Sequence, residues 1–182
     1  DNHMISFSEN AAGNANALIY QLKVVMLGSA PPIWRRLQVP GDAKLDWLHA
    51  VLQVAMGWTN SHLHQFKVGE DYYSNTRSHS AEFEDDLPIL EERTFTLRQI
   101  APREQDAFRY EYDFGDSWEH EITVEKILPN TAASSSARCL EGARACPPED
   151  CGGTPGYDDL LKILENRKHP EHKSMKEWLG RP

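Results

Sequence analysis

Histidine and aspartate side chains that could bind a metal ion occur in two short segments of the sequence. His62 and His64 are separated by one residue in HLHQFKV, and Asp113, Asp116 and His120 lie in DFGDSWEH. Imidazole nitrogens and carboxylate oxygens are common zinc ligands, and a metal ion beside a carboxylate can activate water for hydrolysis. These residues therefore predict a metal-dependent, hydrolase-like enzyme as one candidate function.

The cysteines offer a second candidate metal site, because all three fall between positions 139 and 151. Three thiolates and one histidine would complete a tetrahedral zinc site. The spacing of Cys139, Cys146 and Cys151 differs from the CxxC pattern of common zinc folds. The alternative is a loop shaped by proline and glycine, whose thiols are small buried apolar groups.

The segments that must position these residues have the hydrophobic patterns of strands and helices. Alternation predicts strands over 18–27, 33–39, 62–68, 107–114 and 117–128, the first two forming a hairpin. Apolar residues at helical spacing predict a long helix from Asp42 as its cap to Gly57, and two further helices over 157–166 and 169–180. Residues 95–100 fit either a helix or a strand. The expected fold is α+β, with an antiparallel sheet of about five strands, one long helix early in the chain and two helices at the C-terminus.

The chain is expected to form a single domain over residues 17–182, with a Cys/Pro/Gly-rich loop at 139–156. Residues 1–16 are expected to be a tag remnant and a disordered N-terminal tail, and residues 72–92 an acidic surface loop with a short edge strand at Tyr72-Tyr73. No run approaches the roughly 18 apolar residues that span a bilayer, so no membrane span is predicted. The expected location is the cytoplasm.

The register of the hairpin around DFGDSWEH decides which of its side chains share a face. A three-residue loop, Gly115-Asp116-Ser117, would place Phe114 opposite Trp118 and Tyr112 opposite His120. All large apolar side chains would then fall on one face, whereas a shift of one residue would scatter them. The other face would pair Asp113 with Glu119 and Glu111 with Glu121. Like charges directly opposite destabilise a sheet, so we expect Arg109, a lysine, a metal ion or a basic partner to compensate, unless the face is simply well solvated.

The charge of the chain argues against nucleic acid as its main partner. The formal net charge is −9 at pH 7, whereas nonspecific nucleic-acid binding draws its energy from lysines and arginines on phosphates. The only dense basic stretch is Trp34-Arg35-Arg36, whose two arginines lie in a predicted strand and point to opposite faces. One of them is expected to neutralise Asp113 or Asp116 in an arginine–carboxylate corner.

Four blocks of the sequence resemble the plasmid pRiA4b ORF-3-like family over roughly residues 18–165. The motifs that carry the resemblance are PPIWRR, HLHQF, YDFGDSWEH and CPPEDCGG. The resemblance implies an α+β fold and an association of some members with mobile elements, but it implies no catalytic set. In that family the position of Cys151 is often apolar, which favours Cys139, Cys146 and His120 as the zinc ligands.

The first functional hypothesis is a non-catalytic interaction or accessory module with a protein partner. It rests on the acidic face, the aromatic hairpin and the missing catalytic constellation, and it links the chain to mobile elements through the resemblance. The metal-dependent enzyme is the alternative, and a nucleic-acid-associated protein is the second alternative. The candidate functional residues are Trp34, Arg35, His62, His64, Asp113, Asp116, Trp118 and His120.

Overall fold

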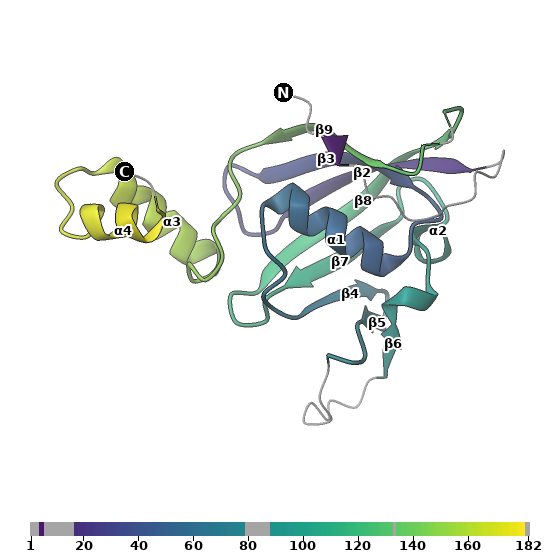
Figure 1. The fold of residues 1–182 in the computed structure, drawn as a ribbon, viewed down its shortest axis with the longest axis horizontal. Coiled ribbons are helices and arrows are strands. Elements are labelled where there is room, and N and C mark those ends of the chain that lie inside the picture. The colour runs from purple at the N-terminus through teal and green to yellow at the C-terminus, as the bar shows by residue number, and fades with distance from the viewer. Residues whose placement is uncertain (1–3, 6–16, 79–87, 133, 181–182) are drawn as a thin grey trace.

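The computed structural model of the chain describes residues 4–5, 17–78, 88–132 and 134–180, which form one sheet with helices packed on and beside it (Figure 1). The strands are β1 (Met4–Ile5), β2 (Leu18–Met26), β3 (Ile33–Pro40), β4 (His64–Val68), β5 (Asp71–Ser74), β6 (Ile89–Glu91), β7 (Ala107–Tyr112), β8 (Trp118–Pro129) and β9 (Ala137–Ala143). The helices are α1 (Leu45–Met56), α2 (Leu97–Ile100), α3 (Gly153–Glu165) and α4 (His172–Trp178), with a 3-10 turn η1 (Glu92–Thr94).

The α+β class is confirmed, but the predicted sheet of about five antiparallel strands is wrong in two respects. It has too few strands, and it lacks a parallel pair at one edge. Nine strands of the described residues pair in the order β1-β9-β3-β2-β8-β7-β4-β5-β6. The pair β5–β6 is parallel, and the other neighbouring strands are antiparallel. No helix of the described residues is both long and apolar enough to cross a membrane.

The strands that the sequence did not predict lie toward the two edges of the sheet. Ala137–Ala143, predicted as loop, forms β9 along β3, and Met4–Ile5 of the predicted tail forms β1 along β9. Most of β9 is exposed, so it carries no alternating apolar pattern, and its position depends on backbone pairing with β3. The rest of the predicted tail and residues 79–87 of the acidic loop lie outside the described residues.

Helix α1 covers one face of the sheet and provides much of the core (Figure 1). Its buried residues are Leu45, Leu48, His49, Val51, Leu52, Gln53 and Met56. The predicted end at Gly57 is confirmed, because Gly57 adopts a left-handed conformation with φ of 73°. The predicted cap at Asp42 is wrong: the helix begins after Lys44, and Asp42 lies 3.6 Å from Arg98.

The remaining helices confirm part of the C-terminal prediction. Helix α3 begins at Gly153, earlier than predicted, and α4 lies within the predicted range. The open choice at residues 95–100 resolves to helix α2, whose capping box joins Thr96 and Gln99. In Figure 1, α3 and α4 pack together beside the sheet, near the turn between β7 and β8.

The predicted register of the β7–β8 hairpin is wrong by two residues. Tyr112 pairs with Trp118, Tyr110 with His120 and Phe108 with Ile122, so five residues separate the strands. The longer loop is possible because Asp113 and Ser117 adopt left-handed φ angles of 60° and 53°. A shift of two residues leaves each paired side chain of β7 and β8 on its predicted face, so the aromatic face is preserved, but Phe114 lies in the exposed loop and not on that face.

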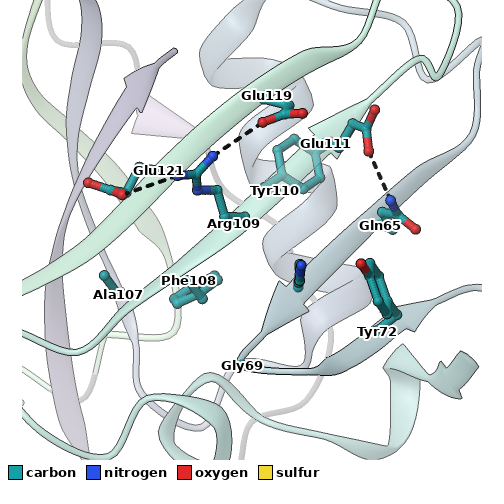
Figure 2. Close-up of a pocket in the computed structure, with 11 residues that line it drawn as sticks. Gln65, Gly69, Tyr72, Ala107, Phe108, Arg109, Tyr110, Glu111, Glu119 and Glu121 are labelled. Carbon is teal, nitrogen blue, oxygen red and sulfur yellow. Dashed lines mark hydrogen bonds and ion pairs between the residues drawn. The ribbon is translucent and has the colours of Figure 1, made fainter. Parts of the chain in front are cut away.

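The opposite face of the sheet is open and carries paired charges (Figure 2). Arg109 lies opposite Glu121, and its guanidinium contacts Glu119 at 3.2 Å and Glu121 at 3.9 Å. Of the expected alternatives, Arg109 provides the compensation. The expected pairs Asp113–Glu119 and Glu111–Glu121 do not form, because Glu111 lies opposite Glu119 in the observed register. A pocket of 530 Å³ lies on this face, lined on one side by these charged groups.

Arg36 binds Glu125 on the same face, and this ion pair should contribute to stability. The distance from Arg36 Nε to Glu125 Oε2 is 2.7 Å, and this hydrogen bond lowers the pKa of Glu125 to about 2. We expect Glu125→Gln to lower the free energy of unfolding at pH 7 by roughly 1.5–3 kcal/mol, as for a charged hydrogen bond. Because the folded pKa is lowered, the difference should persist above pH 4.5 and shrink as the pH falls toward 2. Urea denaturation at pH 7 and pH 3 measures it, with Glu119→Gln as the exposed control.

Candidate functional site

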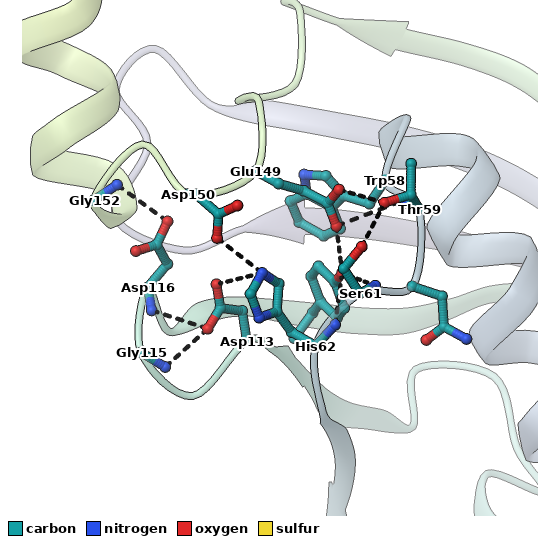
Figure 3. Close-up of polar contacts among 12 residues, drawn as sticks. Trp58, Thr59, Ser61, His62, Asp113, Gly115, Asp116, Glu149, Asp150 and Gly152 are labelled. Atoms are coloured by element: carbon teal, nitrogen blue, oxygen red, sulfur yellow. Dashed lines mark hydrogen bonds and ion pairs between the residues drawn. The ribbon is translucent and has the colours of Figure 1, made fainter.

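Three loops meet at one corner of the sheet and bring together groups that are far apart in the sequence (Figure 3). They are the α1–β4 loop (57–63), the β7–β8 loop (113–117) and the β9–α3 loop (144–152). Each loop carries or borders one of the motifs HLHQF, YDFGDSWEH and CPPEDCGG. The corner is therefore the place where most of the characteristic motifs of the chain coincide.

His62, Asp113 and Asp150 form the centre of this corner. Nε2 of His62 lies 2.9 Å from Oδ1 of Asp150 and 3.6 Å from Oδ2 of Asp113. One ligand atom from each residue lies within 4.8 Å of the other two. The side chain of Asp113 is 10% exposed and that of Asp150 is 68% exposed, so the group is anchored on one side and open to solvent on the other.

Backbone groups fix the carboxylate of Asp113 in this position. Its Oδ1 accepts hydrogen bonds from the N–H groups of Gly115 at 3.0 Å and Asp116 at 3.3 Å. These bonds form because Asp113 is in the left-handed region, where the chain turns back over its own side chain. The second oxygen, Oδ2, faces His62. Such outer hydrogen bonds are the usual way in which proteins orient a metal-binding carboxylate.

The β9–α3 loop is held at both ends. Near its start, Arg35 Nη2 donates to the carbonyl oxygen of Arg144 at 2.9 Å and contacts Cys146 Sγ at 3.0 Å. At its end, the N–H of Gly152 donates to Asp116 Oδ2 at 3.1 Å. Gly153 has φ of 68°, and a Cβ there would lie 2.6 Å from the carbonyl oxygen of Asp116. Only glycine permits this close approach, which brings Asp150 to the β7–β8 loop.

Glu149 joins the α1–β4 loop to the same network. It accepts a 2.6 Å hydrogen bond from the hydroxyl of Thr59 and another from the hydroxyl of Tyr112. Burial, followed by the bond to Glu149, raises the pKa of Tyr112, so its hydroxyl remains a hydrogen-bond donor at neutral pH. The Tyr112 oxygen also accepts from the N–H of Ser61 at 2.9 Å, which orders the chain just before His62.

The electrostatics of the corner favour a cation. Four carboxylates, those of Asp113, Asp116, Glu149 and Asp150, surround one imidazole. Among the described residues, no lysine or arginine forms an ion pair with any of the four. Nε2 of His62 is shielded from solvent and lacks a described partner in hydrogen-bond geometry, although both carboxylates are close. A metal ion would satisfy the nitrogen and neutralise the acids together.

Among the predicted site residues, the structure places His62, Asp113 and Asp116 at the corner and the others elsewhere. Trp118 and His120 are fully buried in the core, and His64 stacks on His49 with ring centroids 3.4 Å apart. These three side chains lie on the face covered by α1, where alternation along β4 and β8 directs them.

The two predicted residues of the basic stretch also lie away from the corner. Trp34 packs on the open face with Lys23 Nζ at 5.3 Å and Arg36 at 5.1 Å from its ring centroid. The expected arginine–carboxylate corner does not form, because Arg36 pairs with Glu125 and Arg35 binds backbone carbonyls.

The predicted metal site at Cys139, Cys146 and His120 does not form. Cys139 is exposed on β9, and Cys146 Sγ lies 3.3 Å from Met56 Sδ. Burial lowers the pKa of His120 to about 4, and its Nδ1 lies 3.3 Å from the carbonyl oxygen of Tyr110. Within the described parts of the chain, the only group of three ligands that is close enough for a metal is His62, Asp113 and Asp150. The three residues do not come together because His120 is fully buried in the core, whereas Cys139 is exposed on β9.

Two functional candidates, Glu149 and Asp150, were not found by the sequence analysis. The signal was present in CPPEDCGG, where two acids stand between a proline pair and a glycine pair. Prolines and glycines build a defined turn, and acids in such a turn are displayed at fixed positions. Because cysteine is a common zinc ligand, the prediction assigned the metal site of this segment to its cysteines and not to these acids.

Comparisons with known proteins agree with the resemblance. A family model described as plasmid pRiA4b ORF-3-like protein matches residues 18–182. The chain is 37% identical over 164 residues to the uncharacterized protein y4hQ of Sinorhizobium fredii (strain NBRC 101917 / NGR234), covering 90% of this chain and 82% of y4hQ. It is also similar to the crystal structure of a protein of unknown function, MM3350 from Methanosarcina mazei Go1, with a TM-score of 0.75 and 34% identity, covering 91% of this chain and 90% of that chain. Neither name states an activity.

Proposed function

The chain belongs to the plasmid pRiA4b ORF-3-like family, and we propose that it is a metal-dependent, hydrolase-like enzyme whose metal ion binds at His62, Asp113 and Asp150. The observation that carries the proposal is the convergence of these three ligands from three separate loops. Their separations of 2.9 Å and 3.6 Å bracket the roughly 3.4 Å expected between two ligand atoms about 2.1 Å from a tetrahedral zinc ion.

The number of ligands supports a catalytic rather than a structural site. Structural zinc sites are closed by four protein ligands, whereas catalytic sites use three and leave a position for water. Zinc is the metal that we propose, because imidazole and carboxylate ligands both suit it. Glu149 is our candidate to accept the proton of the water. Burial raises the pKa of Glu149. Its hydrogen bonds with Thr59 and Tyr112 and the nearby imidazole of His62 together outweigh burial and lower the pKa below its usual value.

The interaction module remains the second candidate, and one observation favours it. The open face of the sheet holds a 530 Å³ pocket beside Tyr72 and Arg109, where a protein partner could dock (Figure 2). Arg109 is shared by Glu119 and Glu121, whereas Glu111 accepts a hydrogen bond from the neutral Gln65, so part of the negative charge of this pocket is compensated. A protein partner, a link to mobile elements, a minor role for nucleic acid and a cytoplasmic location stay predictions.

Zinc titration by isothermal calorimetry tests the proposed site. We expect one zinc per chain in protein freed of metal by chelation, and we expect His62→Ala to weaken binding by roughly 100-fold or more. That loss should exceed the 10- to 100-fold typical of removing an outer hydrogen-bond partner. Asp150→Asn should also weaken binding, and it should not affect folding because Asp150 is exposed.

Two control variants separate the site from general surface binding. His169→Ala and Asp159→Asn change the same residue types in the C-terminal helical region and should leave zinc affinity unchanged. Zinc at 100 times its Kd should stabilise the wild-type protein by about 2.7 kcal/mol in urea denaturation. Zinc binding that is equal in His62→Ala and wild type, or no zinc binding at all, would contradict the proposed site.

A further inference from the structure

A second cavity of 630 Å³ lies directly beside the proposed metal site. It is bounded by the first half of α1, the α1–β4 loop, the end of β5 and the turn η1, and it includes Ser61 and His62 in its wall. His62 is thus common to the cavity and to the metal site. A molecule in the cavity would contact His62, which is also a ligand of the proposed metal, and the volume is within the range of small-molecule sites.

One wall of the cavity is made of two stacked histidines whose positions are fixed. The rings of His49 and His64 are 3.4 Å apart and inclined by 6°. Nε2 of His49 lies 2.8 Å from Oδ1 of Asn60, and its Nδ1 lies 2.8 Å from the hydroxyl of Tyr110. Since an amide oxygen only accepts, the network assigns the proton of His49 to Nε2 and leaves Nδ1 as the acceptor. Both nitrogens of His49 are used, so it is structural.

His64 differs from His49 because only one of its nitrogens is used. Its Nε2 lies 2.7 Å from Oε2 of Glu92, a carboxylate whose residue is 2% exposed. A buried carboxylate is costly unless it is paired, and His64 is the hydrogen-bond partner of the Glu92 side chain among the described residues. Nδ1 of His64 has no hydrogen-bond partner in the described part of the chain. Glu92 therefore orients a ring whose second nitrogen is available to a ligand.

The charges around the cavity select against anions. Arg93 lies in the wall, but it is 3.9 Å from Asp46 and 4.0 Å from Glu91, so its charge is already balanced. Glu92, which is buried in the wall, adds negative potential. A phosphate or carboxylate group would be repelled, whereas an uncharged group with hydrogen-bond donors and acceptors would match the serine, asparagine and histidine side chains of the wall.

We infer that this cavity is the substrate pocket and that it takes an uncharged amide, bound through Nδ1 of His64 and oriented by Glu92. The inference rests on the proposed function, because the reactive bond must reach a metal at His62. Hydrolysis of an amide adds one water across the C–N bond. The water oxygen bonds to the carbonyl carbon, and the two products together gain its two hydrogens as an acid and an amine. Neither an oxidant nor a second substrate is required.

Binding of a neutral diamide, N-acetylglycinamide, tests the pocket without depending on turnover. The ring ¹⁵N resonances of His64 should shift saturably when the diamide is titrated into the zinc-loaded protein, and inorganic phosphate should not shift them. Glu92→Gln should weaken diamide binding by roughly 10-fold, the loss expected when a charged hydrogen bond that orients the ring is removed. Zinc affinity should not change.

A variant at the mouth of the pocket provides a second test in case Glu92→Gln does not fold. Ser78 is exposed and lines the cavity, so Ser78→Trp should obstruct the pocket, abolish diamide binding and leave zinc affinity and stability unchanged. If the wild-type protein does not bind zinc, the proposed metal site itself is refuted. Normal zinc binding without a diamide-dependent shift of His64, or with hydrolysis of bis(p-nitrophenyl) phosphate in preference to a p-nitroanilide, would overturn the inference about the pocket.

Discussion

Acidification from pH 7 to pH 5 should destabilise this protein by about 2 kcal/mol for each of two buried histidines. Burial lowers the pKa of His120 from 6.5 to about 4. Burial, and then the nearby His64, lower the pKa of His49 to about 4 as well. Between pH 6.5 and pH 4 the unfolded chain therefore binds more protons than the folded protein. The free energy of unfolding must fall as the pH falls through this window.

Urea denaturation at pH 7, 6 and 5 measures this effect, and His120→Leu isolates the contribution of one histidine. The variant has its own packing cost, so the informative quantity is the slope of stability against pH. We expect the slope to fall by roughly 1 kcal/mol per pH unit in His120→Leu. It should be unchanged in the control His169→Leu, because that ring accepts only a local backbone hydrogen bond. Equal slopes in wild type and His120→Leu would show that folding does not lower the pKa of His120.

Trp118→Ala should lower the free energy of unfolding by about 3–5 kcal/mol, as large aromatic truncations in cores do. Trp118 is fully buried, and its ring lies 5.9 Å from that of Trp58. Its Nε1 has no hydrogen-bond partner in the described structure, so the expected loss comes from packing. Chemical denaturation at pH 7 measures it.

Phe114→Ala is the matched control, because it changes an aromatic residue in the same hairpin. Phe114 is 38% exposed in the β7–β8 loop, so its removal should cost less than about 1 kcal/mol. The register predicted from the sequence makes Phe114 and Trp118 opposite neighbours on the buried face, and it would give both variants large effects. A loss in Phe114→Ala that is comparable to the loss in Trp118→Ala would support that register against the observed one.

The strands of the sheet centre were predictable because their pattern is local. Tyr20, Leu22 and Val24 alternate with the polar residues Gln21 and Lys23, and all three apolar side chains, with Met26 after them, are buried as period two requires. The faces of the paired side chains of β7 and β8 were predicted correctly for the same reason, whereas Phe114, predicted on the buried face, is exposed in the loop. The register was not predicted, because it depends on the left-handed conformations of Asp113 and Ser117. Positive φ is uncommon in any residue other than glycine, so residue type alone does not identify these positions.

By itself, the sequence determined the α+β class, the helix α1 and the aromatic face of β7 and β8. It also identified His62 and Asp113 as candidate metal ligands. Only the tertiary structure decided which candidates meet. It joined Asp150 to them through pairing of β9 with β3, and it directed His64 toward Glu92. Periodicity reports which way a side chain points from its own strand. The approach of the three loops depends instead on contacts between residues far apart in the sequence, such as Thr59 and Glu149, which are 90 positions apart. Such contacts are set by long-range strand pairing, which no local pattern encodes.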